Sequence, residues 1–396
     1  MENSKPQTHA VIVSSPGVGH LVRDLELGNH LVVDHNLHVT FFVVVESHSS
    51  AGESELVESA RTRKLLNLIE LPAVDISSKV EPSARKFTRL TAVMREICPT
   101  LRSSISAMKL SPTALFVDIF GTLEVDGEYV VQKEQLRLPG CMSVRPDDVV
   151  DPLLDRTKLE YCVFLQVGLE MRQSDGILVN TWEDLDPTTL KAMREQEGYG
   201  SVPVYAVGPL IRPDKPSAQQ ITELAWGLEL SQQRFIWVLR PPSKDKGSNA
   251  LDYLPDGFLE RTQNLGLVVM QWAPQSEILG HISIGGFLSH CGWNSSLESI
   301  LNGVPIIAWP LYAEQKMNAT MLAEELGVAV RPKIAPTKGI IGREEIEMMV
   351  RKVMEGQDGK AMRARVKELK NSGEKALTEG GSSFNALSHL AKQCER

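Results

Sequence analysis

The stretch GGFLSHCGWNSSLESILNGVPIIAWP, residues 285–310, contains the pattern that decides the fold class. An apolar run leads into the polar loop 290–295, a helical segment of about two turns follows, and Asn302-Gly303 precedes a second apolar run. Strand, helix and strand in this order, with continuously apolar strands, indicate a parallel sheet covered by helices on both faces. Ser295 to Glu298 matches the S-x-x-E pattern, which predicts a capping box where the helix begins.

The same alternation extends over most of the chain. Strands are expected at 9–15, 38–45, 113–118, 176–180, 202–207, 234–240, 265–271, 282–290 and 304–310. Helices are expected at 21–33, 221–231, 295–302, 342–355, 359–378 and 384–393. A proline-rich segment divides the chain into two α/β domains in tandem. The expected parts are a first domain 1–206, a linker 207–217, a second domain 218–380 and a C-terminal helix within 381–396.

Composition limits the class of protein. The chain has 396 residues and a net charge of −8, which argues against a nucleic-acid partner because such partners select a basic face. The first ten residues do not resemble a signal peptide, and the longest apolar run is too short to span a bilayer. Five scattered cysteines without a CxxC pair indicate reduced thiols. We therefore expect a cytoplasmic protein with no membrane partner.

The loop at the helix start is the first candidate site. Ligands of open α/β sheets bind at the carboxyl ends of strands, and the start of a helix attracts anions such as phosphate. His290 and Ser295 could add donors to the same anion, although His290 and Trp293 are equally compatible with core positions and Glu298 with a helix cap. No zinc site is expected, because His281 and His290 lack a Cys or carboxylate pattern around them.

A wider window, residues 272–315, reads WAPQSEILGHISIGGFLSHCGWNSSLESILNGVPIIAWPLYAEQ. It strongly resembles the plant secondary product glycosyltransferase box, the 44-residue signature of plant UDP-sugar glycosyltransferases, from its first Trp to its last Gln. Further stretches resemble the branch of that family that glucosylates phenols, the hydroquinone and monolignol glucosyltransferases. These stretches are SPGVGH (15–20), LFVDIFGT (115–122), LRLPGC (136–141), GILVNTWEDL (176–185) and WPLYAEQKMNA (309–319).

The resemblance implies a GT-B fold, in which two Rossmann-like domains face each other across a cleft. The donor would bind the second domain and the acceptor mainly the first, and the last helix would cross back to the first domain. The implied donor is UDP-glucose, with no metal and no further cofactor. The donor-binding residues carried over from the box are Trp272 on the uracil, Gln275 on the nucleoside, Glu298 on both ribose hydroxyls, His290, Asn294 and Ser295 on the diphosphate, and Glu314 and Gln315 on the sugar with Trp293 close by.

Transfer of a sugar to a hydroxyl also needs a base. His20 follows the first expected strand at a helix start, and histidine suits proton abstraction near neutral pH. Asp118 ends another expected strand, so both residues are predicted at one edge of the parallel sheet. A carboxylate there would orient the imidazole, although Asp118 could also cap a helix. The resemblance implies that this His–Asp pair is catalytic and that the reaction inverts the anomeric centre.

The sequence departs from the family pattern at two main places. Pro216 runs directly into the expected helix, so the strand and the Gly/Ser-rich turn that open the second domain in the family are absent. After Thr122 the chain omits a further helix, strand and acceptor-pocket segment, and Arg23 stands where the family has a Pro. The second domain is therefore expected to lack its first strand, which would expose apolar sheet edges.

Three functions remain open from the sequence. The first is an inverting UDP-glucose-dependent O-glucosyltransferase, expected to be a monomer, acting on small phenolic acceptors of the hydroquinone or phenylpropanoid type. The second is a truncated, weakly active or inactive relative that still binds UDP-sugar. The third is an NAD-dependent oxidoreductase, which is disfavoured because the loop PGVG before His20 lacks the third glycine of the dinucleotide fingerprint.

Overall fold

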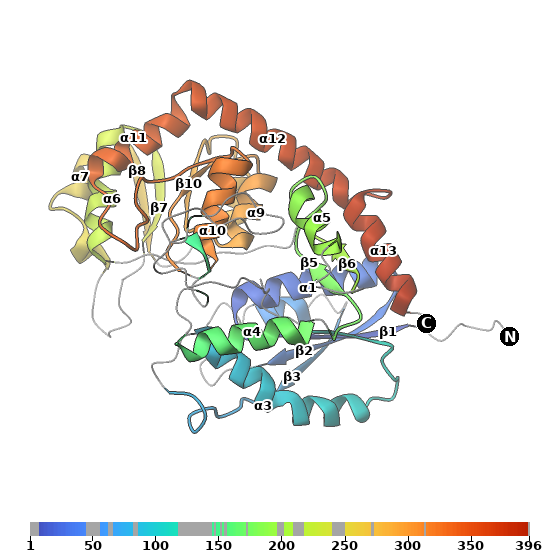
Figure 1. Ribbon diagram of the computed structural model, residues 1–396. Helices are drawn as coiled ribbons and strands as arrows, with labels where there is room; N and C mark the ends of the chain where they lie inside the picture. The colour runs from blue at the N-terminus through green and yellow to red at the C-terminus, as the bar shows by residue number, and fades with distance from the viewer. Residues whose placement is uncertain are drawn as a thin grey trace. The chain divides into compact units, whose positions relative to one another are not determined.

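The structure is a computed structural model (Figure 1). The residues that it describes are 8–44, 56–61, 66–81, 86–117, 145, 148–150, 153, 157–171, 173–195, 202–208, 218–239, 250–270, 273–312 and 314–394. The chain divides into two compact units, and each is described by itself. The first comprises Met1–Val131, Pro152–Arg212 and Lys375–Arg396, and the second comprises Gln132–Asp151 and Pro213–Glu374.

The described elements follow the alternation expected from the sequence. Those of the first unit are β1 (His9–Ser14), α1 (Val18–Val33), β2 (His38–Val44), β3 (Asn67–Leu71), α3 (Lys86–Ser106), β4 (Ala114–Val117), α4 (Leu159–Met171), β5 (Ile177–Val179), α5 (Pro187–Glu195), β6 (Val204–Ala206) and α13 (Ser382–Cys394). Those of the second are α6 (Ala218–Ser231), β7 (Phe235–Leu239), a 3₁₀ turn (Ala250–Tyr253), α7 (Phe258–Arg261), β8 (Gly266–Met270), α8 (Gln275–Leu279), β9 (Phe287–Ser289), α9 (Trp293–Leu301), β10 (Ile306–Ala308), α10 (Gln315–Thr320), a π-helical turn (Met321–Glu325), β11 (Ala329–Val330) and α11 (Arg343–Met354). The long helix α12 (Gln357–Leu377) begins in the second unit and ends in the first.

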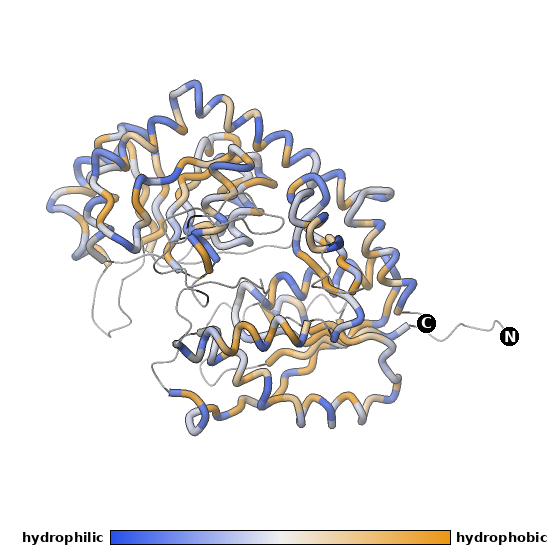
Figure 2. Tube along the Cα trace, viewed as in Figure 1, coloured by the Kyte–Doolittle hydropathy of each residue, from blue (hydrophilic) through white to orange (hydrophobic). Residues whose placement is uncertain are grey.

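A parallel sheet of order β3-β2-β1-β4 forms the centre of the first unit. Its residues alternate between two cores, because successive side chains of a strand point to opposite faces. Ile12 packs with residues of α1 and α13 on one face, whereas Val13 packs with residues of α3 on the other. Strands β1 and β2 are covered on both faces, and most of their residues are hydrophobic, as the orange strands of this sheet in Figure 2 show. The predicted α/β class is confirmed.

Helix α13 packs in the first unit. Leu387 and Leu390 belong to the same core as β1 and β2. Two hydrogen bonds add to this packing: Ser383 Oγ donates to the carbonyl of Gly208 at 2.9 Å, and Tyr205 Oη donates to Gln393 Oε1 at 2.6 Å. The last helix is therefore part of the first unit's core, although it is 175 residues away from Gly208 in sequence.

The sheet of the second unit is interrupted. Strands β11, β10 and β9 pair in one sheet, and β7 and β8 pair in another, and among the described residues no strand joins the two. The exposed fractions of Ile236 in β7 and Leu267 in β8 are 45% and 57%, high values for apolar strand residues in an α/β domain. Helix α6 is the first described element after Pro213. These observations agree with the expectation that the second domain lacks its first strand.

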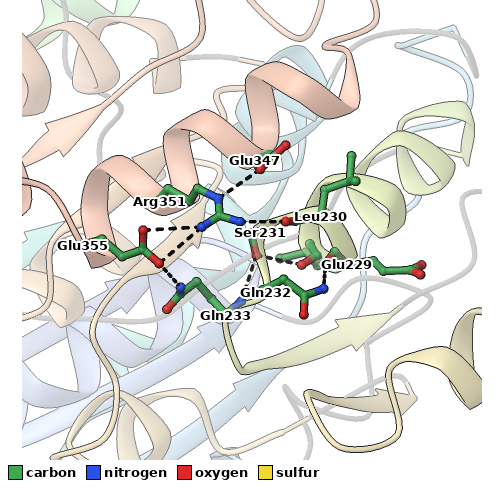
Figure 3. A network of polar contacts seen from close by, with 9 residues as sticks. Glu229, Leu230, Ser231, Gln232, Gln233, Glu347, Arg351 and Glu355 are labelled. Atoms are coloured by element: carbon green, nitrogen blue, oxygen red, sulfur yellow. Dashed lines mark hydrogen bonds and ion pairs between the residues drawn. The ribbon is translucent and has the colours of Figure 1, made fainter.

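Helices α6 and α11 nevertheless pack closely in the second unit. A Cβ atom on Gly227 would lie 2.5 Å from the side chain of Ile346, so only glycine permits this approach. The end of α6 is also fixed by Arg351 of α11, whose guanidinium donates to the carbonyl of Leu230 at 3.1 Å and to Glu347 at 3.0 Å (Figure 3).

Among the helices that the structure describes, none combines the length and the apolar character that a membrane span requires.

Candidate active site

Cys291, in the loop between β9 and α9, has a φ of 62°, which lies in the left-handed region. Asn318 Nδ2 donates to the carbonyl of Cys291 at 2.9 Å, and Cys291 N donates to Ser289 Oγ at 3.2 Å. These two bonds hold an unfavourable backbone conformation in place. The loop is therefore a fixed structure that determines where α9 begins.

The predicted capping box is wrong. Helix α9 begins at Trp293 with Gly292 as its N-cap and with no side-chain cap, so Ser295 lies three residues inside the helix. Glu298 consequently lies in the second turn, too far along the helix to reach back to the N-cap. The helix therefore starts earlier than the S-x-x-E pattern suggested.

His290 lies directly against the start of this helix. A Cβ atom on Gly292 would lie 2.4 Å from the His290 Nε2 atom, so the ring lies directly against the backbone of Gly292. The half-buried imidazole is thus held beside the first turn of α9. Imidazole and helix start together form a region suited to a negatively charged group.

Ser295 adds a buried hydroxyl in the same turn. Its side chain is fully buried, and its Oγ has no hydrogen-bond partner among the described residues. A buried hydroxyl without a partner is unfavourable. Asn294 and Trp293, the other residues predicted for this turn, are half-buried. Four of the predicted donor-binding residues therefore lie together at the start of α9.

Gln275 and Glu298 meet although they are 23 residues apart. Gln275 is the first residue of α8, and its Nε2 donates to Glu298 Oε2 at 2.5 Å. Glu298 is only 2% exposed, so this bond orients a carboxylate that is almost completely buried. The structure thus brings together two residues that were predicted to bind the nucleoside. Trp272, predicted for the uracil, lies outside the described residues.

Gln315 and Glu314 lie where α10 begins. The buried Gln315 accepts hydrogen bonds through Oε1 from the backbone N–H groups of Leu311, at 2.9 Å, and Tyr312, at 3.1 Å. These two bonds fix the orientation of the carboxamide and direct its oxygen toward the preceding loop. Glu314 is the exposed N-cap residue of the same helix.

His20 lies in the first turn of α1, in the other unit. Its backbone N–H donates to the carbonyl of Gly17 at 3.1 Å, and its Nδ1 atom is buried. Asp118 lies outside the described residues, but its neighbour Val117 ends β4 and pairs with Val13 of β1. Strands β1 and β4 are parallel, so the segments that carry His20 and Asp118 both leave the same edge of the sheet.

Asp24, which the sequence analysis did not single out, follows His20 by one helical turn in α1. Residues four apart lie on the same side of a helix, and Asp24 is 7% exposed. Its Oδ1 accepts a hydrogen bond from Arg23 Nε at 3.2 Å. In the sequence, the four-residue spacing of His20 and Asp24 would have indicated that both lie on the same side of a helix.

The thiol of Cys291 is not suited to act as a nucleophile or as a metal ligand at this site. Burial raises the pKa of its thiol to about 12, and only the backbone N–H of Trp309 opposes that effect. A neutral thiol is a poor nucleophile and a poor metal ligand. Within the described ranges, no group of three or more His, Cys, Asp or Glu side chains is arranged to hold a metal ion.

Comparison with known proteins identifies the family. The family model for UDP-glucoronosyl and UDP-glucosyl transferase matches residues 165–366. The chain is 46% identical to anthocyanidin 3-O-glucosyltransferase 5 of Manihot esculenta, over all of this chain and 96% of the relative. The chain belongs to this family. It is also 38% identical to hydroquinone glucosyltransferase of Rauvolfia serpentina, with 98% of each chain covered.

The fold of this UDP-glycosyltransferase is also that of its relatives. It matches the crystal structure of TcCGT1 in complex with UDP with a TM-score of 0.88, at 40% identity, over 98% of this chain and 99% of that one. The GT-B expectation is confirmed, and the NAD-dependent oxidoreductase alternative is wrong. The alignment with the Manihot relative spans 472 positions, whereas this chain has 396 residues. The relative therefore carries segments that this UDP-glycosyltransferase lacks.

Proposed function

We propose that this UDP-glycosyltransferase transfers glucose from UDP-glucose to the hydroxyl group of a small phenolic acceptor, with inversion at the anomeric carbon. The observation that carries the proposal is the arrangement around α9. The buried Glu298 is oriented by Gln275, and His290 and the unpartnered hydroxyl of Ser295 lie at the start of the helix. The similarity to a hydroquinone glucosyltransferase supports a phenolic acceptor.

The donor half of the site follows from these positions. Glu298 accepts hydrogen bonds from the ribose hydroxyls, and Gln275 holds the carboxylate in place. The diphosphate lies at the start of α9, where a phosphate oxygen gives Ser295 Oγ the acceptor that it otherwise lacks. Trp272 stacks on the uracil, and Glu314 and Gln315 bind the glucose hydroxyls.

The acceptor half uses His20 as general base. Its neutral imidazole takes the proton of the phenol as the phenolic oxygen attacks the anomeric carbon and the bond to UDP breaks. The Nδ1 atom is buried, so the acceptor approaches the Nε2 side of the ring, and a carboxylate such as Asp118 stabilises the imidazolium. The departing UDP carries away the electron pair of the broken bond, and the start of α9 with His290 stabilises its charge without a metal ion.

One observation favours a second candidate, a relative that binds UDP-sugar but transfers it slowly or not at all. Among the described residues, the strands of the second unit form two separate sheets, and the alignment with the Manihot relative is longer than this chain. A donor site that is intact on α8, α9 and α10 can bind nucleotide even where the neighbouring scaffold is incomplete, but catalysis requires reacting groups to be held closely.

Two measurements test the proposal. Thermal shift with UDP, UDP-glucose and NAD should show stabilisation by the first two only, because a ligand that binds the folded state raises its melting temperature. Mass spectrometry of a phenol panel incubated with UDP-glucose should then show a monoglucoside. Nucleotide stabilisation without any product would select the second candidate, and stabilisation by NAD alone would refute both.

A pair of variants tests the base. His20→Ala should abolish glucoside formation and leave UDP binding intact, because the base contacts the acceptor and not the nucleotide. His30→Ala is the matched control, since His30 lies on the same helix and its described partner is Asp34, at 2.6 Å on the surface. Turnover by His20→Ala within a factor of about two of the control would refute the assignment.

A further inference from the structure

A buried carboxylate that the donor-site residues do not include lies in the segment Gln132–Asp151, which interrupts the first unit in sequence and belongs to the second. Asp148 is only 4% exposed. Its Oδ2 atom accepts three hydrogen bonds: from Arg145 Nε at 2.7 Å, Thr320 Oγ1 at 2.9 Å and Arg331 Nη2 at 3.0 Å. A buried charge with this many donors is well compensated, and removal of one partner disturbs all the others.

The partners of Asp148 connect it to α10. Thr320 is the last residue of α10, and Arg331 directly follows β11. Arg331 Nη1 also donates to Thr320 Oγ1, so Asp148, Thr320 and Arg331 form a closed triangle of contacts. The triangle fixes the end of α10 relative to the end of a sheet strand. Strand β11 is parallel to β10 and β9, so its carboxyl end lies on the sheet edge from which the loop to α9 leaves.

The other end of α10 carries the side chains assigned to the sugar. The helix has six residues, about 9 Å, and begins with Gln315 after the N-cap residue Glu314. A short helix held at its last residue moves as a rigid rod, so a shift at Thr320 displaces Gln315 as well. The π-helical turn that follows Thr320 offers no regular α-helical continuation to hold α10 instead.

We propose that Asp148 is a positioning residue for the sugar end of the donor site. It acts through Thr320 and α10 on Glu314 and Gln315, and it does not touch the donor. This inference rests on the proposed function, because it takes UDP-glucose as the ligand of the site. Asp148 therefore affects recognition of the glucosyl group more than recognition of UDP, whose assigned contacts lie on α8 and α9.

The test compares UDP-glucose with UDP. In Asp148→Asn, the volume is kept and the charge is lost, so Arg331 faces a neutral amide and the triangle loosens. The dissociation constant of UDP-glucose should rise about tenfold, as expected for displacement of contacting groups by an ångström or less, and that of UDP should stay within about twofold. Isothermal titration of the full chain measures both constants. Glu223→Gln is the matched control, because Glu223 binds Arg343 between α6 and α11 and should leave both constants unchanged.

Two further variants keep the test decisive if Asp148→Asn folds poorly. Thr320→Val removes the bridging hydroxyl and keeps the ion pair, and it should weaken UDP-glucose about threefold without changing UDP. Asp148→Asn combined with Arg331→Met removes both charges and should restore the melting temperature. If Asp148 only neutralises Arg331, the double variant also recovers wild-type affinity for UDP-glucose, which would overturn the inference.

The outcomes separate the inference from the function on which it rests. Selective loss of UDP-glucose affinity in Asp148→Asn and Thr320→Val supports the inference. Equal weakening of UDP and UDP-glucose, or no change in folded variants, overturns it while the proposed function stands. Wild-type protein that binds neither nucleotide overturns the proposed function and the inference together.

Discussion

Replacement of Glu298 by glutamine changes the best-defined contact of the donor site. Glu298 is 2% exposed, and its Oε2 accepts a hydrogen bond of 2.5 Å from Gln275 Nε2. Glutamine has nearly the same shape but only one acceptor oxygen. If that oxygen keeps the bond to Gln275, the amide NH₂ faces the ribose in place of a carboxylate oxygen.

The magnitude follows from that exchange. At least one charge-assisted hydrogen bond to the ribose is lost, and such bonds contribute about 1.5–3 kcal/mol. Each 1.4 kcal/mol is a factor of about ten in affinity. We therefore expect the dissociation constant of UDP to rise about 10- to 100-fold in Glu298→Gln, with a similar rise for UDP-glucose because both ligands carry the ribose.

Isothermal titration with UDP measures this effect, and a swapped pair of residues serves as its control. Gln275→Glu combined with Glu298→Gln keeps one amide and one carboxylate in contact but moves the charge from α9 to α8. This double variant should melt near the wild-type temperature and still bind UDP weakly. Glu298→Gln that binds UDP within about threefold of wild type would refute the ribose assignment. A double variant that regains full affinity would show that the carboxylate matters only for packing.

Three further outcomes are expected. Cys291 should resist alkylation at pH 8 in the native protein, while the exposed thiols react within minutes, because its pKa of about 12 keeps it protonated; rapid labelling of Cys291 measured by peptide mass spectrometry would contradict this. Burial raises the pKa of Asp186 above its ordinary 3.8, so the folded state holds the proton more tightly than the unfolded state does. The free energy of unfolding therefore falls as the pH rises from 3.8 through the raised pKa. Asp186→Asn removes this loss, so the melting temperature of the variant relative to wild type should increase from pH 3.5 to pH 7, and a constant difference over that range would contradict the prediction. The Cζ atoms of Arg261 and Arg343 lie over the Trp226 ring, 4.8 and 5.1 Å from its centroid, so Trp226→Ala should lower the melting temperature by a few degrees and Trp226→Phe by less, as calorimetry can show.

Many of the buried strands were readable from the sequence because burial leaves a strong local signal, whereas β3, α3, α4 and α5 were not among the expected elements. Strands β1 and β2 contribute residues to two cores, so most of their residues are apolar, whereas Leu115 and Val117 of β4 are 51% and 43% exposed. The interruption in the second unit was also readable, since Pro216 leads directly into the sequence of α6. The helix start at Trp293 was not, because the short-range S-x-x-E pattern predicted a start at Ser295, whereas Gly292 is the N-cap and no side chain caps the helix.

The sequence by itself determined the fold class, the family and the donor-site residues, because these depend on hydrophobic periodicity and on a contiguous motif of 44 residues. Only the tertiary structure decided how those residues work together. The contact between Gln275 and Glu298 and the hydrogen bonds from Thr320 and Arg331 to Asp148 join side chains that lie far apart in the sequence. Such contacts depend on side-chain distances after folding, and no spacing along the chain encodes them. For Asp148, 172 residues separate it from Thr320, and packing of the second unit alone brings them to within 2.9 Å.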